Sequence, residues 1–317
     1  MAGSGQEPGR APRREPGQGE RYRVAARALR NRMVRRIVAG GGLTDPAWRA
    51  AFAEVPRHLF VPGYDRPADE MDARRRLRWL AAAYADQPIA THVVAGELVS
   101  SISQPSLMAL MCEALDVGTG QRVLEIGAGT GYNAALLAHR LGPDTVTTVD
   151  LDEEITAAAR AHLAGYGTPA ARSVVVVTGD GALGHQDRAP YDRIVATCEL
   201  PGIPPAWLRQ CVPGGRILAP FATGLVLLTV RGPTSAEGRF LSTPAFFVPL
   251  RGTGGGTPGT AGIGGGAGAG ARIGEEIFAG RRLDRTRFGL TVDGPRQWVW
   301  LDDPHGPDTW PLTSPTP

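Results

Sequence analysis

Lysine is absent from the sequence, cysteine is rare, and no apolar run reaches the length of about 20 residues that spans a bilayer. The N-terminus is rich in arginine, glycine and proline and has no apolar core of the secretory type. Three scattered cysteines, Cys112, Cys198 and Cys211, favour buried free thiols over a disulfide framework or a metal site. We therefore expect a cytoplasmic protein without a membrane segment or a bound metal.

Charge is distributed unevenly along the chain. The 317 residues carry a formal net charge of +3. Residues 1–40 contain ten arginines and three glutamates, a balance of +7 that leaves −4 for the remainder. Such an arm can contact nucleic acid or an acidic peptide. A solvated tail that leads into an exposed helix face explains the charge more simply, so we expect no nucleic-acid partner.

Composition divides the chain into five segments. With 42% apolar residues, the sequence can form one large domain or two ordinary ones. We expect a disordered leader over 1–20, a helical and acceptor-loop region over 21–103, an α/β core over 104–250, a glycine-rich linker over 251–270 and a tryptophan-rich extension over 271–317.

Two of these segments contain informative patterns. Asp45 followed by Pro46 predicts a helix that starts there and ends near Val55. The extension holds three of the six tryptophans, at positions 298, 300 and 310. Because so much aromatic surface is unlikely to stay solvated, the extension either packs on the core as a lid or forms a peptide-docking surface.

Residues 123–132 form the most informative segment. They read Val-Leu-Glu-Ile-Gly-Ala-Gly-Thr-Gly-Tyr, an apolar strand pattern followed by alternating glycines. Glycines at 127, 129 and 131 permit positive φ angles and a close approach to a ligand. The GxGxG spacing differs from the GxGxxG that dinucleotide folds prefer. The turn therefore indicates nucleotide chemistry without fixing the cofactor.

Two further apolar runs end in a carboxylate, Asp150 after residues 146–149 and Asp180 after residues 174–179. Helical patterns separate most of these runs, as parallel crossover connections require. Ligands of open α/β sheets bind at the carboxyl ends of the strands, and Asp150 lies about 20 residues past the glycines, where such folds hold a ribose. Helix capping is the competing role for both carboxylates.

Seven short segments form a specific pattern when they are taken together. They are Val-Pro-Arg-His-Leu-Phe-Val-Pro at 55–62, Ala-Tyr-Ala-Asp at 83–86, Ser-Ile-Ser-Gln-Pro at 101–105, Leu-Glu-Ile-Gly-Ala-Gly-Thr-Gly-Tyr at 124–132, Gly-Asp-Gly at 179–181, Tyr-Asp-Arg-Ile-Val-Ala-Thr at 191–197 and Pro-Gly-Gly-Arg at 213–216. In this order they resemble the protein-L-isoaspartate (D-aspartate) O-methyltransferase family over residues 43–250.

The resemblance implies a fold, a cofactor and a reaction. The fold is a doubly wound, Rossmann-like α/β sheet of seven strands, and the 104–250 core would bind S-adenosyl-L-methionine, release S-adenosyl-L-homocysteine and methylate a carboxylate. The glycine turn would hold the methionine portion, Asp150 the ribose hydroxyls and Asp180 the adenine amine. The implied cofactor-binding residues are Glu125, Gly127, Ala128, Gly129, Gly131, Tyr132, Asp150, Leu151, Asp180 and Gly181.

Ser103 matches the active-site serine of that family. Pro105 predicts a helix start directly after it. Free N–H groups and a partial positive charge at a helix N-terminus suit a substrate carboxylate, and the Ser103 hydroxyl adds a donor. A plain helix N-cap is the other role for Ser103.

The remaining predicted acceptor residues are Tyr84, Asp86 and Thr197, which we expect to line the acceptor pocket. A carboxylate with an ordinary pKa of about 4 is already ionised at neutral pH, so the transfer needs no general base. Positioning and partial desolvation then supply the catalysis. We therefore expect His58 and His92 to be structural.

Two departures from the family pattern concern the acceptor. The family's enzymes end soon after the last sheet strand, near Leu250 here, and they have a short glycine loop where this chain has residues 91–101. The chain combines Ser-Ser-Ile-Ser-Gln-Pro at 100–105 with Trp-Val-Trp-Leu-Asp-Asp-Pro at 298–304 in the extension. This combination resembles actinobacterial methyltransferases that act on ribosomal peptides modified by ATP-grasp enzymes or containing lanthionine. That resemblance implies methylation of an Asp side chain in a cyclised peptide, after which the ester closes to an aspartimide.

Other functions remain open at this point. The nearest is repair of isoaspartyl residues in damaged proteins, with the same cofactor and chemistry. A non-catalytic nucleotide sensor or scaffold would not need Ser103 beside a complete cofactor pocket, and a nicotinamide dehydrogenase would have a different glycine spacing. We expect a monomer whose partner is a peptide or protein bearing Asp or isoaspartate.

Overall fold

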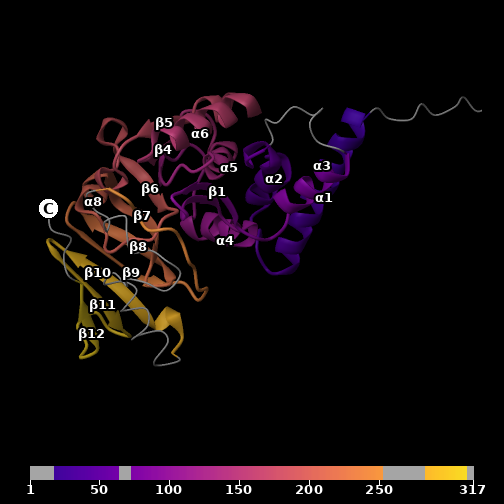
Figure 1. Ribbon diagram of the computed structural model, residues 1–317. Coiled ribbons are helices and arrows are strands. Elements are labelled where there is room, and N and C mark those ends of the chain that lie inside the picture. The colour runs from indigo at the N-terminus through magenta and orange to yellow at the C-terminus, as the bar shows by residue number, and fades with distance from the viewer. Residues whose placement is uncertain (1–17, 64–72, 253–282, 313–317) are drawn as a thin grey trace, which may run out of the picture.

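The computed structural model describes residues 18–63, 73–252 and 283–312 (Figure 1). Residues 1–17 of the predicted leader lie outside this part, and helix α1 (Gln18–Ala39) already includes residues 18–20. Of the predicted linker over 251–270, only Arg251 and Gly252 are described.

Three helices form a layer at one end of the molecule (Figure 1). They are α1, α2 (Pro46–Glu54) and α3 (Ala73–Ala83). Helix α2 begins as predicted, because the Asp45 carboxylate accepts a hydrogen bond from the Ala47 N–H at 2.7 Å and Pro46 occupies the first turn. Across the described ranges, no helix combines the length and the apolar character that crossing a membrane requires.

Ten strands form one mixed sheet in the order β12-β11-β10-β9-β8-β7-β6-β3-β4-β5. Strands β5, β4, β3, β6 and β7 run parallel, and β7 to β12 pair antiparallel. Their bounds are β3 Val123–Ile126, β4 Val146–Asp150, β5 Val175–Thr178, β6 Tyr191–Ala196, β7 Cys211–Phe221, β8 Gly224–Gly232, β9 Ser235–Phe240, β10 Phe288–Asp293, β11 Arg296–Leu301 and β12 Thr309–Pro311.

Helices cover both faces of the parallel half of the sheet. One face carries α4 (Pro105–Leu115), α5 (Tyr132–Leu141), α6 (Glu153–Tyr166) and α7 (Pro169–Arg172), and the opposite face carries α8 (Pro205–Gln210). Alternate residues of β3 show the division, because Val123 packs in the core beneath α4 and α5 whereas Leu124 and Ile126 pack in the core beneath α8. This two-sided cover is the predicted doubly wound architecture.

The sheet is longer than the seven strands implied by the sequence. Strands β3 to β9 account for those seven, and β10 to β12 come from the tryptophan-rich extension. Phe288 and Leu290 of β10 belong to the same buried core as Trp207 of α8. From β11, the Gln297 side chain binds both the N–H and the carbonyl of Ile203 at 2.8 Å. Residues 288–311 therefore lengthen the sheet.

The tryptophans of the extension are largely occupied with packing. The Trp300 ring lies against Gly289, where an added Cβ would approach the ring to 2.1 Å. The Trp300 indole N–H donates to Thr291 Oγ1 at 2.9 Å, and the Arg239 guanidinium stacks 4.6 Å from the ring centroid. The Trp298 indole N–H donates to the Pro304 carbonyl.

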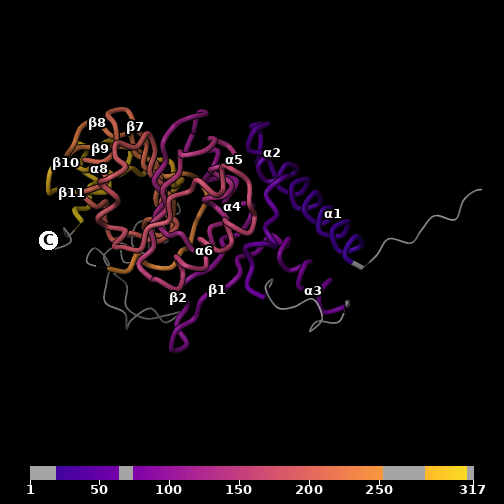
Figure 2. The backbone as a smooth tube through the Cα atoms, turned by 90° about the horizontal axis from the view of Figure 1, so that it is seen from above, coloured from indigo at the N-terminus to yellow at the C-terminus, as the bar shows by residue number. Residues whose placement is uncertain are grey.

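A separate two-stranded hairpin precedes the core. Strands β1 (Ile89–Val94) and β2 (Glu97–Ile102) pair only with each other among the described strands, and the hairpin projects from the body in Figure 2. It corresponds to the long acceptor loop noted in the sequence. At its base, Ile102 is buried in the core beneath α4.

Candidate functional site

Two cavities meet at Gly127, at the carboxyl ends of the parallel strands. The Asp150 cavity is lined by Val99, Ile126, Gly127, Val149, Asp150, Leu151, Gly181, Cys198, Val248, Pro249, Leu250 and Arg251. The Ser103 cavity is lined by Ser101, Ile102, Ser103, Met108, Glu125, Gly127, Ala128, Gly129, Thr130, Tyr132, Asn133 and Thr197. The predicted cofactor and acceptor residues are thus brought to one edge of the sheet, where open α/β folds bind their ligands.

The glycine turn between β3 and α5 has the predicted backbone. Gly127, Gly129 and Gly131 adopt φ angles of +97°, +50° and +84°. At Gly127 an added Cβ would lie 2.5 Å from Thr197 Oγ1, so this position has room for glycine alone. The Thr197 hydroxyl donates to the Gly127 carbonyl at 2.9 Å, which holds the turn in place.

Gly131 has a packing role instead of lining either cavity. An added Cβ there would lie 3.3 Å from both the Ala159 carbonyl and the Leu163 side chain of α6. The third glycine therefore brings α5 close to α6, while the first two face the cavities.

Asp150 ends β4 with its carboxylate already engaged. It accepts a hydrogen bond from the Gly129 N–H at 3.1 Å and forms an ion pair with Arg251 Nη2 at 3.5 Å. Burial raises the pKa of the Asp150 carboxyl above its ordinary value. Leu151, also predicted from the resemblance, lines the same cavity. Asp150 thus faces the space where a ribose would bind.

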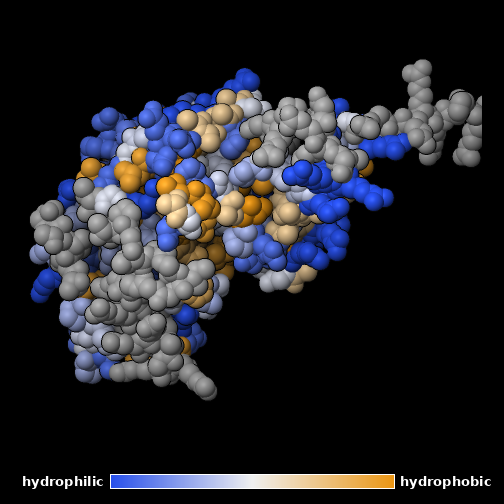
Figure 3. Space-filling model, viewed as in Figure 1, coloured by the Kyte–Doolittle hydropathy of each residue, from blue (hydrophilic) through white to orange (hydrophobic). Residues whose placement is uncertain are grey.

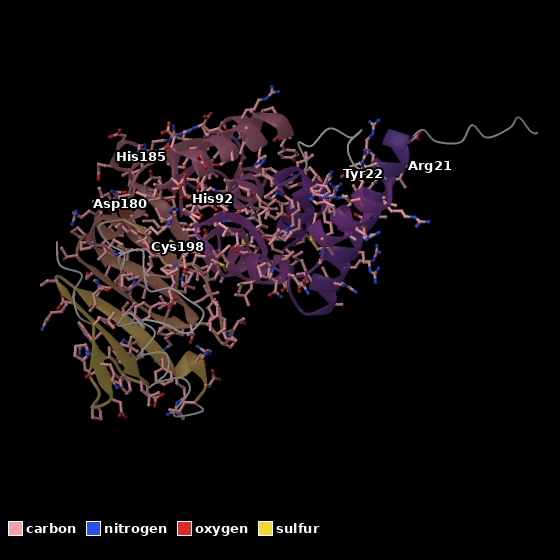
Figure 4. All side chains as sticks on the ribbon, in the orientation of Figure 1. Arg21, Tyr22, His92, Asp180, His185 and Cys198 are labelled. Carbon is pink, nitrogen blue, oxygen red and sulfur yellow. The ribbon has the colours of Figure 1, made fainter. Side chains whose placement is uncertain are left out.

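Asp180 lies beside the Asp150 cavity and acts as a helix cap. Its carboxylate accepts a hydrogen bond from the Ala182 N–H at 2.9 Å, at the start of the short helix Gly181–Leu183. Gly252 lies against the same carboxylate, where a Cβ would approach to 2.6 Å. Figure 4 labels Asp180 together with Cys198, whose backbone follows β6 and lines the cavity. One oxygen of Asp180 therefore caps this helix, the alternative role that the sequence offered for Asp180.

Glu125 is a fully buried carboxylate in the wall of the Ser103 cavity. Its Oε1 accepts a hydrogen bond from Asn133 Nδ2 at 2.6 Å, and the Thr148 hydroxyl on the neighbouring strand also interacts with this carboxylate. Burial raises the pKa of Glu125 to about 7. A buried carboxylate in a cavity wall suits a cationic ligand group such as an ammonium.

Ser103 lines its cavity as predicted, but the neighbouring helix end differs from the expectation. The Asp86 carboxylate accepts hydrogen bonds from the Ser106 N–H at 2.8 Å and from Gln104 Nε2 at 3.2 Å. Asp86 therefore closes the N-terminus of α4, which the sequence suggested would be open to a substrate carboxylate. This is a correction, and it leaves the Ser103 hydroxyl as the predicted acceptor contact.

Tyr84 also lies behind the cavity wall. Its hydroxyl is 2.6 Å from His58 Nδ1, and both side chains are buried. Burial lowers the pKa of His58 to about 4 and raises the pKa of Tyr84 to about 12. His58 is therefore neutral at physiological pH, in keeping with the structural role expected for it. Of the four predicted acceptor residues, Ser103 and Thr197 line the cavity, whereas Tyr84 and Asp86 support it.

Arg57 is the site residue that sequence reasoning missed. It lies on the short helix Arg57–Phe60, is fully buried, and donates from Nη2 to the carbonyls of Ser103 at 3.2 Å and Gln87 at 3.4 Å. Its guanidinium also lies 5.7 Å from the ring centroid of Tyr132. An arginine inside an otherwise apolar motif was the available signal, because a buried guanidinium needs a specific role.

The three cysteines lie in the hydrophobic core of the described part of the chain. Cys112, Cys198 and Cys211 are buried free thiols, as predicted, and burial raises the pKa of each. Within the same ranges, no three His, Cys, Asp or Glu side chains gather in a way that could hold a metal ion.

Known proteins are similar to this chain in sequence and in fold. The family model described as "Protein-L-isoaspartate(D-aspartate) O-methyltransferase (PCMT)" matches residues 28–249. The "Protein-L-isoaspartate O-methyltransferase 1" of Anaeromyxobacter sp. (strain Fw109-5) is 40% identical over 224 residues, which cover 69% of this chain and 95% of that protein. The "Protein-L-isoaspartate O-methyltransferase" of Methanoregula boonei is 41% identical over 228 residues, covering 70% of this chain and 93% of that protein.

Solved structures agree at the level of the fold. A protein-L-isoaspartate O-methyltransferase aligns with a TM-score of 0.65 at 21% identity, covering 86% of this chain and all of that one. A putative protein-L-isoaspartate O-methyltransferase from Plasmodium falciparum, in complex with S-adenosyl-L-homocysteine, aligns with a TM-score of 0.55 at 15% identity, covering 71% of this chain and 98% of that one.

Proposed function

The chain belongs to the protein-L-isoaspartate(D-aspartate) O-methyltransferase family, and from that premise we propose that it methylates the side-chain carboxylate of an aspartyl residue in a dedicated peptide. The coarser activity is S-adenosyl-L-methionine-dependent carboxyl O-methylation of a protein or peptide. One observation carries the proposal: the Ser103 cavity is lined by acceptor residues and by the glycine turn at once.

The residues present fit S-adenosyl-L-methionine. The Asp150 carboxylate would accept hydrogen bonds from the ribose hydroxyls, and the space beside Gly181 would take the base. The Glu125 carboxylate in the wall of the Ser103 cavity would receive the ammonium of the methionine portion. The close approach of Gly127 to Thr197 leaves no room for a side chain between turn and ligand. When bound, this cofactor supplies a methyl group on a positively charged sulfur.

The chain's own part in the transfer is positioning and exclusion of water. An acceptor carboxylate at Ser103 is ionised at neutral pH and needs no proton removed. The Ser103 hydroxyl would hold one oxygen of this carboxylate and leave the other oxygen free to accept the methyl group that the cofactor would supply. The walls of the Ser103 cavity would limit solvent there.

We propose further that the acceptor belongs to a cyclised ribosomal peptide and that the ester closes to an aspartimide. In that step the backbone nitrogen of the following residue bonds to the ester carbonyl carbon, the nitrogen loses its proton, and the methoxy group leaves as methanol after taking up a proton. The product is the imide, one water lighter than the starting peptide.

Two features support a dedicated peptide substrate. The hairpin of β1 and β2 occupies the predicted long acceptor loop and leads directly to Ser103, the residue after β2. The extension beyond the family match adds a cavity of about 430 Å³, lined in part by Trp298, Pro304, His305 and Pro311. Aromatic and proline side chains in a concave surface are suited to an extended peptide. The extension would thus contribute to the choice of substrate.

Repair of isoaspartyl residues is the second candidate function. The two relatives above bear the name of the repair activity, and this chain covers 93% or more of their length. The chemistry is identical, so only the acceptor separates the two functions.

Mass spectrometry after incubation with S-adenosyl-L-methionine separates them. The acceptors are an unstructured isoaspartyl peptide, the same peptide with ordinary aspartate, and a macrocyclic aspartyl peptide. Methylation of the macrocycle followed by a net loss of one water supports aspartimide formation. Efficient methylation of the isoaspartyl peptide alone would assign the protein to repair and contradict the proposal.

A further inference from the structure

Exposed apolar side chains occur on the hairpin that leads to Ser103 and beside the Asp150 cavity. Within the described residues, eight large apolar side chains are exposed. Six of them lie on the hairpin or within two residues of a residue that lines the Asp150 cavity, and we call these six the apolar rim: Val93, Val94, Leu98, Leu151, Leu183 and Phe246. The other two, Val24 and Leu77, lie on α1 and α3.

The rim is continuous with the catalytic cavities through strand β2. Val99 lines the Asp150 cavity, and Ser101, Ile102 and Ser103 line the Ser103 cavity. The hairpin of β1 and β2 projects from the body of the protein (Figure 2). A polypeptide with its acceptor at Ser103 would therefore pass along this hairpin.

Two irregularities interrupt the pairing register of β1 and β2. His92 pairs with Ser100 and Val93 pairs with Leu98, so Val99 is an extra residue on β2. Such bulges re-aim side chains beside active sites. Val99 here lines the Asp150 cavity, while Val93 and Leu98 form a cross-strand apolar pair that is 56% and 46% exposed.

The other three rim residues come from separate elements near the Asp150 cavity. Leu151 lines the Asp150 cavity, Leu183 is two residues past its lining residue Gly181, and Phe246 is two residues before Val248. Phe246 is 76% exposed. Apolar atoms also gather in the middle of the molecular face shown in Figure 3, the face toward which the hairpin points. Large exposed apolar side chains beside a cavity favour an interaction site there.

We propose that the apolar rim binds the apolar side chains that flank the acceptor residue in the polypeptide substrate. The inference deepens the proposed function and rests on it. Because the acceptor must reach the Ser103 cavity, the flanking residues are the occupants that this surface must meet. The enzyme therefore selects acceptors with bulky apolar neighbours over acceptors with small polar ones.

The test uses paired fluorescein-labelled peptides that share one acceptor and differ in its neighbours, leucine in one and serine in the other. Each pair is made with aspartyl and with isoaspartyl acceptors. Dissociation constants come from fluorescence anisotropy with saturating S-adenosyl-L-homocysteine, and methylation of the same peptides is followed by mass spectrometry. The full-length protein is compared with the double variant Val93→Asn/Leu98→Asn.

The chain offers a matched control in Val24→Asn/Leu77→Asn. Val24 is 62% and Leu77 is 49% exposed, close to the rim pair, and both lie outside the rim. We expect the leucine-flanked peptide to bind about tenfold more tightly than the serine-flanked one. The rim variant should erase this preference, and the control variant should keep it.

The other outcomes distinguish failure of the rim proposal from failure of the proposed function. A wild-type protein without the preference, or a control variant that also erases it, overturns the rim proposal. Methylation without a preference for the leucine-flanked peptide would contradict the rim proposal alone. A binding preference without methylation would contradict the proposed function alone. If neither binding nor methylation occurs, both fail. If Val93→Asn/Leu98→Asn instead dissociates a dimer in analytical ultracentrifugation, a second copy of the chain occupies the rim and the proposal is overturned.

Discussion

The guanidinium of Arg57 donates a hydrogen bond from Nη2 to the backbone carbonyl of Ser103 across 3.2 Å. Arg57 is fully buried, and its Nε and Nη1 atoms have no hydrogen-bond partner within the described residues. Keeping a buried guanidinium with donors unused is costly, so its bond to Ser103 indicates a function. Arg57 is therefore a positioning residue that fixes the serine relative to the glycine turn.

The first prediction concerns Arg57. Arg57→Met should lower kcat by about ten- to a hundredfold, since a small displacement of Ser103 spoils the alignment of acceptor and methyl group. The dissociation constant of S-adenosyl-L-methionine should stay within about twofold, because Arg57 lines neither cavity. Arg57→Lys should recover part of the loss, because an ammonium can still reach one carbonyl. Steady-state kinetics and calorimetric titration measure the two effects, and equal losses in both would contradict the positioning role.

Ser103→Ala tests the acceptor contact itself. The change removes one hydroxyl from the cavity wall, so we expect a lower turnover with cofactor affinity nearly intact. The loss of one hydrogen bond to a charged group corresponds to about ten- to a hundredfold in kcat/KM. Kinetics with separate measurement of cofactor binding provides the check. A large loss of cofactor affinity would refute the assigned role.

Glu125 predicts a pH dependence of stability. Burial raises the pKa of Glu125 from 4.5 to about 7, so the folded protein retains a proton that the unfolded chain releases in this interval. The associated stability is fully present below pH 4.5 and is lost as the pH rises toward 7, by an amount on the order of 3 kcal/mol. Urea denaturation at several pH values should show this slope in the wild type relative to Glu125→Gln. Identical slopes in the two proteins would contradict the account.

The same carboxylate predicts a pH dependence of cofactor binding. Only the ionised form of Glu125 attracts the ammonium of the methionine portion. The affinity for S-adenosyl-L-methionine should therefore rise as the pH increases through about 7, and Glu125→Gln should bind weakly without that rise. Isothermal titration at matched ionic strength measures it, and an unchanged affinity in Glu125→Gln would remove Glu125 from the site.

The contacts between the extension and the core predict an effect on the free energy of unfolding for a substitution far from the cavities. Gln297→Ala leaves the buried N–H and carbonyl of Ile203 without partners, which costs about 2–4 kcal/mol of the free energy of unfolding. Arg296→Ala on the same strand is the control, because Arg296 pairs with Asp293 at an exposed surface and such pairs contribute less than about 1 kcal/mol. Equal effects in urea denaturation would mean that the extension is separable from the core.

Local patterns made part of this fold predictable. The cap at Asp45 and the strands at 123–126 and 146–150 follow from short-range chemistry, and the structure confirms them. The pairing of β10 with β9 was not predictable, because it joins segments about fifty residues apart through backbone hydrogen bonds that leave no local pattern. The extension was expected to pack on the core as a lid or to form a docking surface, whereas its strands lengthen the sheet and share the sheet's core.

The residues of the site also differ in how far the sequence predicted them. Asp150 was identifiable because a carboxylate at a strand end follows a simple rule. Asp86 was expected in the pocket, yet it caps α4 from 20 residues away, a contact that only the tertiary structure creates. Arg57 stood out as an arginine in a recognised motif, but its bond to Ser103 spans 46 residues, so the sequence did not show which residue it contacts.

The central claim is that the two cavities meeting at Gly127 transfer a methyl group to a carboxylate. It is tested most directly by incubating the full-length protein and an aspartyl or isoaspartyl peptide with S-adenosyl-L-methionine tritiated in its methyl group. The account predicts label that base releases from the peptide as volatile methanol, with strong reduction in Ser103→Ala. Label that resists base, or equal labelling by Ser103→Ala, would contradict it.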